Sequence, residues 1–227
     1  MTSSSSSRGT IHFVIVVKRN SNCRRTDGPG AIRILAQLTR LRRACCHPQL
    51  IDPDSEVPSS KLKVFADTLE EILAGGHKVL VFSQFVDHLA FVREHLEAED
   101  ISYQYLDGST PTKKRQQAVD AFQSGDGDVF LISLKAGGFG LNLTAADYVI
   151  HLDPWWNPAA EDQASDRAHR IGQQRPVTVY RLIVRNTIEE KIVALHHRKR
   201  ELAESLLEGT SKAARLTPDD MLELLRS

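Results

Sequence analysis

The sequence predicts an α/β fold in which helices cover both faces of a parallel sheet. Apolar segments of strand length alternate along the chain with amphipathic segments of helix length, and this alternation requires crossover connections between parallel strands. Strand-like segments such as "VLVF" and "VFLI" are apolar throughout, as expected for strands that are buried on both sides. In such sheets the chemistry lies at the carboxyl ends of the strands.

Apolar residues at helical spacing indicate a first helix over Ile32–Cys46, which ends at "HPQL" and is followed by a turn-rich linker. A second helix is expected over Ser60–Ala74, with Ser60 as its N-cap and "GG" at its end. The further strands are expected at "KVLVFS", "SYQYLDG", "DVFLIS", "YVIHLD" and "VTVYRLIV". The further helices are expected over Val86–Glu99, Thr112–Gln123, Asn157–Arg170, Thr187–Leu207 and the terminal segment "TPDDMLELLR".

Changes in composition divide the chain into four regions. Residues 1–30 are expected to be a disordered or non-native leader, since "MTSSSSSRGT" has low complexity, although "IHFVIVV" could be a genuine edge strand. Residues 31–58 form a helix and linker, residues 59–185 the main α/β lobe, and residues 186–227 a helical C-terminal region. The serine run lacks the basic start and apolar core of a signal peptide.

Composition limits the classes of function. The formal net charge of the 227 residues is zero, so any nucleic-acid binding must come from local basic patches. Two of the three cysteines are adjacent, which makes a disulfide framework implausible and fits a reducing compartment. No apolar run approaches the length that spans a bilayer, so no membrane association is expected.

The glycine-rich stretch "SLKAGGFGLNL", residues 133–143, is the strongest loop signal. Glycines such as Gly138 and Gly140 allow a backbone to approach a ligand closely, and exposed N–H groups there can form an anion nest. Ser133 and Lys135 add a hydroxyl and a cation suited to a phosphate; a flexible turn between strand and helix is the alternative. The spacing fits neither a dinucleotide fingerprint nor a Walker A loop, and the chain contains no acidic Mg²⁺-holding motif.

The segment "DQASDRAHRIGQ" places Gln163, Arg167 and Arg170 at i, i+4 and i+7, and therefore on one face of the expected helix. Arginine presents a planar fork of donors that matches phosphate oxygens. One interpretation is a pair of arginine fingers that contact a nucleotide phosphate. The other is a solvated face in which Asp162 and Asp166 pair with the arginines.

Three other clusters are ambiguous. "CCHP" has two cysteines and a histidine but no second cysteine pair at metal-ligand spacing, so a helix end with a buried thiol is favoured and no metal site is expected. The basic run "HHRKR" could be a solvated face or a phosphate contact. Trp155 and Trp156 point apart on any regular element, so one is expected in the core and the other could contact a nucleic acid or a partner.

The motifs "KVLVFSQF", "YLDGST", "SLKAGGFGLNLTAADYVIHLDPWWNP" and "DQASDRAHRIGQ" occur in this order, and together they resemble the second RecA-like lobe of the Swi/Snf-type branch of superfamily 2 helicase-related ATPases. The resemblance runs from Ile32 to the C-terminus. It implies that a first RecA-like lobe, in the same or an adjacent chain, holds ATP and Mg²⁺. It also implies that Arg167 and Arg170 are fingers that reach the γ-phosphate, with Gln163, Gly138 and Gly140 near the nucleotide.

The resemblance further implies that the chain contacts double-stranded DNA through its backbone. Hydroxyls, amides and backbone N–H groups at phosphates position a duplex without reading its sequence. The matching positions are Ser83, Gln84, Gly108, Ser109, Ser133, Lys135 and Asn142, with Trp155 as a further candidate. Residues 186–227 would form a brace across the two lobes.

Three functions remain to be distinguished. The first is the second lobe of an ATP-dependent translocase on double-stranded DNA, which would be inactive when isolated because Walker A and the acidic motif are missing. The second is a non-catalytic module that binds DNA or a partner. The third, an unrelated nucleotide-binding enzyme, is disfavoured by the glycine spacing. The expected location is the bacterial cytoplasm in association with DNA, or the nucleus of a eukaryote.

Overall fold

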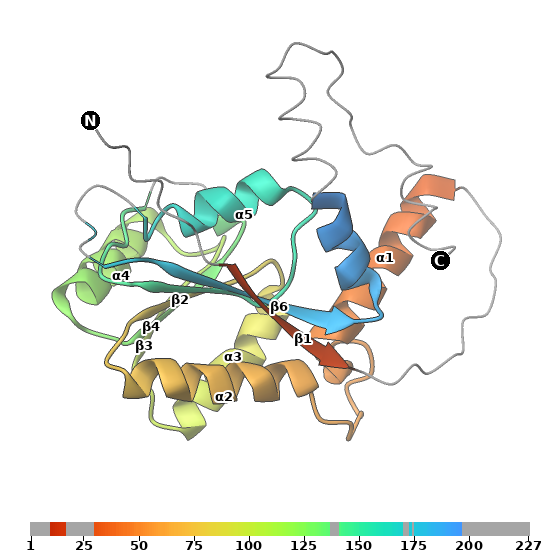
Figure 1. Cartoon of the computed structure of the whole chain (residues 1–227), viewed down its shortest axis with the longest axis horizontal. Coiled ribbons are helices and arrows are strands. Elements are labelled where there is room, and N and C mark those ends of the chain that lie inside the picture. The colour runs from red at the N-terminus through yellow and green to blue at the C-terminus, as the bar shows by residue number, and fades with distance from the viewer. Residues whose placement is uncertain (1–9, 17–29, 137–140, 170–172, 174, 197–227) are drawn as a thin grey trace, which may run out of the picture.

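The computed structural model describes residues 10–16, 30–136, 141–169, 173 and 175–196 of the chain. The described strands form one all-parallel sheet of six strands in the order β1-β6-β5-β2-β4-β3 (Figure 1). Their bounds are β1 Thr10–Val16, β2 Val79–Ser83, β3 Tyr103–Leu106, β4 Val129–Ser133, β5 Tyr148–His151 and β6 Thr178–Arg185. The α/β prediction is therefore confirmed. The edge strand considered for "IHFVIVV" is present as β1, while the domain boundary at residue 30 stays a prediction.

Helices cover both faces of the sheet. They are α1 Gly30–Cys46, α2 Ser60–Ala74, α3 Val86–Ala98, α4 Thr112–Ser124 and α5 Pro158–Ser165, with a 3₁₀ turn over Pro48–Leu50. Helices α2 and α3 pack on the face that carries Val79 and Val81 of β2. Helices α4 and α5 pack on the opposite face, which carries Leu80 and Phe82. Each residue of β2 and β4 is buried, as the apolar runs predicted.

A smaller core joins α1 to the last described helix. Helix α1 lies beside a further helix over residues 188–196, which is the unlabelled blue helix of Figure 1. Leu38 of α1 packs there against Ile188 and Ile192. None of the helices in the described part of the chain is long and apolar enough to cross a membrane.

Several helix ends differ from the sequence-based expectation, most of them by one or two residues, and the N-cap of α2 and the end of α5 bear on the argument. The N-cap of α2 is Ser59 rather than Ser60, and its Oγ accepts a hydrogen bond from the Leu62 N–H at 3.1 Å. Helix α5 ends at Ser165 rather than Arg170. Beyond it the N–H of Arg167 bonds to the Ala164 carbonyl at 3.3 Å, three residues back, so the chain tightens into turns.

Because α5 ends at Ser165, the predicted helix face shared by Gln163, Arg167 and Arg170 is wrong. Gln163 lies on the helix and is exposed, but Arg167 follows its end and is only 3% exposed. Arg170 lies outside the described residues, as do Gly138, Gly140 and the predicted helices beyond residue 196. Gln163 and Arg167 therefore do not lie on one regular helix.

Candidate DNA and nucleotide interface

The carboxyl ends of β2 and β4 bring Ser83 and Ser133 into register as neighbours. Both are buried. The Ser83 hydroxyl donates a hydrogen bond to the Asp153 carboxylate and accepts one from the Phe85 N–H at 3.0 Å. The Ser133 hydroxyl accepts one from the Ala136 N–H at 3.3 Å. In this structure the two hydroxyls thus hold the strand ends and the loops after them, and their direct contact with DNA stays a prediction.

The loop after β3 is ordered by one carboxylate. Oδ1 of Asp107 accepts hydrogen bonds from the Ser109 N–H at 2.8 Å, the Ser109 hydroxyl at 2.7 Å and the Thr110 N–H at 3.1 Å. Partial burial raises the pKa of Asp107, but hydrogen bonds from Ser109, Tyr105 and Thr110 outweigh it and lower the pKa below its usual value. The carboxylate therefore stays ionised and holds Gly108 and Ser109 at the surface, where both are exposed.

Arg115 of α4 joins this loop to the loop after β4. Its guanidinium donates to the carbonyls of Thr110 at 2.6 Å, Asp107 at 3.0 Å and Gly108 at 3.2 Å. It also donates to the Ala136 carbonyl at 3.3 Å, next to the exposed Lys135. We call this arrangement the Arg115 clamp. No sequence pattern predicts this clamp, because the partners are backbone carbonyls; the one signal is the basic run "KKR" that follows "DGSTPT".

Gln84 and Trp156 both contact Arg42, a buried arginine. Nη1 of Arg42 donates to the Gln84 side-chain oxygen at 2.8 Å, and Nη2 donates to the Pro154 carbonyl. Its guanidinium lies 5.1 Å from the centre of the Trp156 ring, which is a cation–π contact. Trp155 is half-buried, and its backbone N–H donates to the Glu161 carboxylate at 2.7 Å. Trp156 is also half-buried and packs against the small core around Leu38, so neither tryptophan is fully buried.

The segment that carries Arg167, which we call the arginine segment, is hydrogen-bonded to the end of the glycine-rich loop. The Leu143 N–H donates to the Arg167 carbonyl at 3.1 Å, beside the exposed Asn142. Gln173 strengthens the connection, because its side-chain nitrogen donates to the Ala146 carbonyl at 2.7 Å and to the Ala168 carbonyl at 3.3 Å. The two segments therefore form one connected unit.

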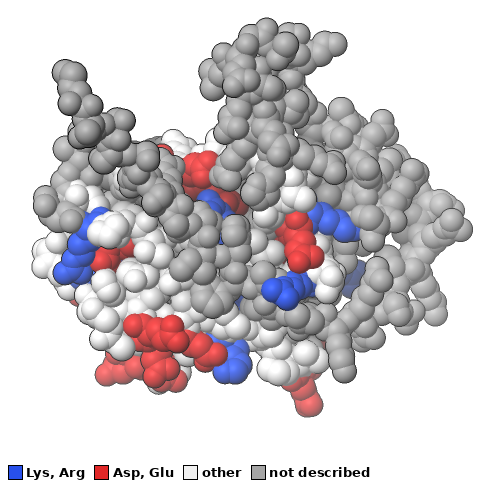
Figure 2. All heavy atoms as spheres, viewed as in Figure 1, with Lys and Arg blue, Asp and Glu red and all other residues white. Residues whose placement is uncertain are grey.

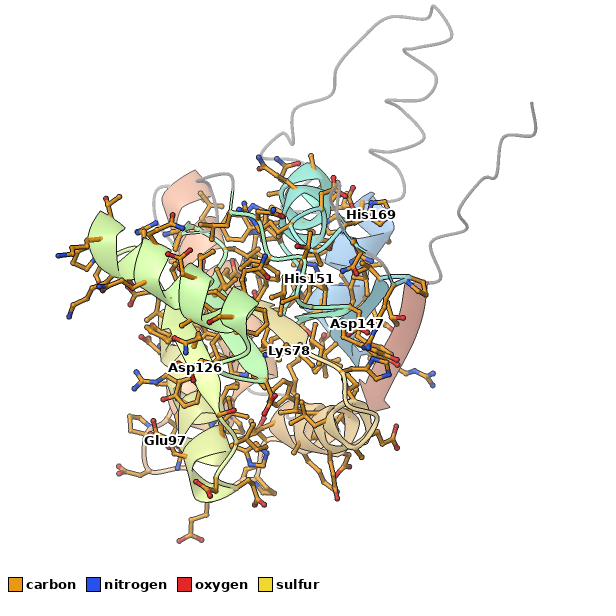
Figure 3. All side chains as sticks on the ribbon, turned by 90° about the vertical axis from the view of Figure 1, so that its left-hand side faces the viewer. Lys78, Glu97, Asp126, Asp147, His151 and His169 are labelled. Atoms are coloured by element: carbon orange, nitrogen blue, oxygen red, sulfur yellow. The ribbon has the colours of Figure 1, made fainter. Side chains whose placement is uncertain are left out.

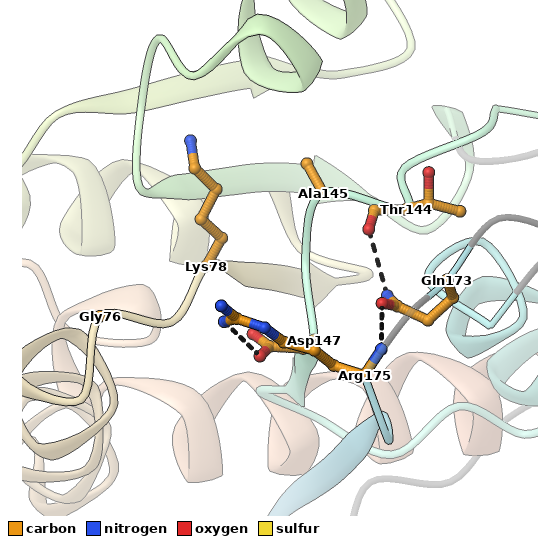
Figure 4. A pocket seen from close by; sticks show the side chains of 7 residues that line it. All are labelled: Gly76, Lys78, Thr144, Ala145, Asp147, Gln173 and Arg175. Carbon is orange, nitrogen blue, oxygen red and sulfur yellow. Dashed lines mark hydrogen bonds and ion pairs between the residues drawn. The ribbon is translucent and has the colours of Figure 1, made fainter.

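A cavity of about 320 Å³ lies at the opposite, amino-terminal edge of the sheet (Figure 4). Lys78 and Asp147, which line it and are labelled in Figure 3, immediately precede β2 and β5. Oδ2 of Asp147 is paired with Arg175 at 3.3 Å and with His77 at 2.7 Å. None of the predicted site residues lines this cavity.

On the face drawn in Figure 2, acidic side chains form one larger group at the lower edge, and basic side chains lie in smaller separate groups. This distribution agrees with the zero formal net charge, so a nucleic acid would depend on local contacts such as those around the Arg115 clamp.

The "CCHP" segment does not form a cluster of its own. The His47 ring stacks on Phe91 with centroids 4.0 Å apart, and its Nδ1 accepts a hydrogen bond from the Gln49 N–H at 3.2 Å. From the run "HHRKR" only His196 is described. It is 3% exposed and its Nε2 bonds to the Trp155 carbonyl, so this histidine is part of the interior.

Comparison with known proteins matches the region of the chain that carries the sequence motifs. Residues 61–172 match the family model for the helicase conserved C-terminal domain. An uncharacterized ATP-dependent helicase of Mycoplasma genitalium is 38% identical over 201 residues, which cover 88% of this chain and 20% of that protein. The chain spans about a fifth of the length of the curated relatives it matches.

Solved structures agree with the sequence comparison. The SWI2/SNF2 ATPase core of Sulfolobus solfataricus in complex with dsDNA has a TM-score of 0.66 and 35% identity, covering 86% of this chain and 40% of that one. The SWI2/SNF2 ATPase C-terminal domain of the same organism has a TM-score of 0.66 and 31% identity, covering 87% of this chain and 84% of that one. The chain therefore belongs to the SWI2/SNF2 family and corresponds to the C-terminal helicase lobe of its ATPases.

Proposed function

We propose that the chain is the second motor lobe of an ATP-dependent translocase on double-stranded DNA. The observation that carries this proposal is the Arg115 clamp, which fixes two neighbouring loops at the carboxyl edge of the sheet. These loops expose Gly108 and Lys135, which offer a backbone N–H group and a cation to phosphates, while the Ser109 N–H and hydroxyl already donate to Asp107. Such contacts suit a motor that passes over any sequence. The related archaeal core in complex with dsDNA supports the same partner.

The nucleotide would lie between this lobe and a first RecA-like lobe. The 227 residues contain no Walker A loop and no acidic Mg²⁺-holding motif, so ATP and Mg²⁺ would be held mainly by that first lobe. Arg167 and Arg170 would supply positive charge to the transferred phosphoryl group, with Gln163, Gly138 and Gly140 close by. Because Leu143 bonds to the Arg167 carbonyl, movement of the DNA-contacting loop would be transmitted to the arginine segment.

The chain alone is expected to show no ATP hydrolysis above background, because it lacks the groups that cradle the phosphates and hold Mg²⁺. Phosphate release should be measured on the purified chain with and without duplex DNA. DNA-dependent turnover that co-purifies with the chain through successive columns would contradict this expectation.

Lys135→Ala is expected to weaken binding to all DNA duplexes alike and to reduce the slope of log affinity against log salt by about 1, since one phosphate contact is lost. The matched control is Arg175→Ala, which removes one positive charge at the opposite edge of the sheet, where the side chain is 62% exposed. Affinities should be measured at several salt concentrations on two unrelated duplexes. Sequence-selective binding with little salt dependence would favour the non-catalytic binding module instead.

A further inference from the structure

Three buried side chains with metal-binding chemistry meet beneath the carboxyl edge of the sheet. Cys46 ends α1, His88 lies in the first turn of α3, and Asp153 follows β5. Their ligand atoms all lie within 4.8 Å of one another, and all three residues are at most 1% exposed. Segments far apart in the sequence thus place a thiol, an imidazole and a carboxylate around one point.

His88 is the group in this cluster whose polar atoms are least satisfied. Both of its ring nitrogens are buried without a hydrogen-bond partner among the described residues. Buried polar groups are nearly always paired, since an unpaired one is costly. Burial also lowers the pKa of this imidazole to about 3, so the ring is neutral and one nitrogen keeps a free lone pair.

The carboxylate of Asp153 is already oriented by a second layer of donors. Its Oδ2 accepts from the Ser83 hydroxyl and its Oδ1 from the Gln84 N–H at 3.2 Å. Nη2 of Arg42 lies 3.9 Å from Oδ1. A carboxylate has about four lone-pair sites, so these contacts leave room for a metal bond. Outer donors of this kind are the usual way in which protein fixes a metal ligand.

A reactive thiol explains the cluster less well. Burial raises the pKa of Cys46 well above its usual value, and the residue is fully buried, whereas reactive cysteines are accessible thiolates. When a metal ion binds, the Cys46 S–H bond breaks, the proton passes to the buffer and an Sγ–metal bond forms. The thiolate and the Asp153 carboxylate together neutralise a divalent ion, so the charge of the cluster rises by one, from −1 to zero, when the ion enters and the thiol proton leaves.

We propose that Cys46, His88 and Asp153 bind one Zn²⁺ ion, a site that the sequence analysis did not expect. Thiolate and imidazole favour Zn²⁺ over Mg²⁺ or Ca²⁺, and a tetrahedral zinc site keeps its ligand atoms about 3–4 Å apart, which a small contraction of this cluster reaches. The ion would fix the ends of α1 and α3 to the segment after β5. This places it directly under Ser83 and Gln84, so it would stiffen the base of the proposed DNA interface.

Cobalt offers a direct test, because Co²⁺ occupies zinc sites and a cobalt–thiolate bond has a charge-transfer absorption. The full chain with Cys23→Ser and Cys45→Ser keeps Cys46 as its only cysteine. Titration of this metal-stripped variant with Co²⁺ is expected to give thiolate-to-cobalt absorption that saturates at about one ion per chain. Added Zn²⁺ is expected to abolish the absorption as it displaces Co²⁺.

A ligand variant completes the experiment. His88→Ala in the same background is expected to lower the Co²⁺ affinity by more than about tenfold, the effect that even second-layer changes reach. Circular dichroism should confirm that this variant is folded. If the variant is unfolded, the Co²⁺ titration of the single-cysteine chain decides the question by itself. The proposal is overturned if that chain shows no cobalt–thiolate absorption, or if a folded His88→Ala variant binds Co²⁺ as tightly as its parent.

Discussion

Replacing Arg167 or Arg170 by Ala, in this lobe joined to a matching first lobe, is expected to lower kcat for DNA-stimulated ATP hydrolysis by about 10³-fold or more. The affinity for ATP is expected to change little, because the first lobe would make most ground-state contacts and the two arginines would act mainly on the transition state. The measurement is kcat and nucleotide affinity for both variants at saturating DNA.

Two further variants separate a catalytic effect from a structural one. Arg→Lys at either position is expected to give no rescue, because a point charge does not reproduce the planar fork of donors. Arg175→Ala removes a guanidinium from the same segment and is expected to retain kcat, since its guanidinium pairs with Asp147 at the other edge of the sheet. Arg167 is 3% exposed, so the melting temperature of each variant must be measured as well. Normal kcat in both alanine variants would remove the arginine-finger assignment.

The positions of the central strands along the chain could be predicted because these strands are buried on both faces, whereas the order of the strands in the sheet was not predicted. A buried strand must be apolar throughout, so "VLVF" and "VFLI" mark β2 and β4 in the sequence itself. Glycines mark where two of the helices stop: Gly75 caps α2 and Gly125, with φ of 109°, caps α4. These are local signals, and they place the candidate loops at the carboxyl edge of the sheet.

The end of α5 and the links between the loops depend on contacts that no local pattern contains. The apolar spacing continues through Ala168, so a helix to Arg170 was the natural prediction, yet the Arg167 carbonyl accepts a hydrogen bond from Leu143, far away in sequence. The Arg115 clamp uses backbone carbonyls, which every sequence offers equally. The cluster of Cys46, His88 and Asp153 is assembled by the packing of three separate elements. Predicting any of these requires the tertiary structure first.

A buried ion pair connects the α/β lobe to the helix over residues 188–196. Nζ of Lys61 lies 2.6 Å and 2.7 Å from the two carboxylate oxygens of Glu189, and both side chains are at most 1% exposed. Burial lowers the pKa of Lys61, but the attraction of Glu189 outweighs it and raises the pKa above its usual value. The raised pKa keeps Lys61 protonated at neutral pH, and burial also raises the pKa of Glu189 above its usual value. Glu189 also accepts a hydrogen bond from the Val184 N–H at 2.9 Å, at the end of β6.

Glu189→Gln is expected to lower the free energy of unfolding by about 3–5 kcal/mol, because it leaves the Lys61 ammonium buried without its counter-charge. For a domain of this size the melting temperature should fall by about 6–20 °C. The control is Lys63→Ala on α2, the helix that also carries Lys61. Lys63 is 74% exposed and pairs with Asp67 at 3.0 Å, and an exposed pair is worth about 1 kcal/mol or less. The double change Lys61→Met with Glu189→Leu should cost less than Glu189→Gln, since no buried charge remains. Denaturant unfolding of the parent chain and the three variants gives each free energy of unfolding. Equal stability of Glu189→Gln and Lys63→Ala would show that the buried pair does not hold the helix over residues 188–196 to the lobe.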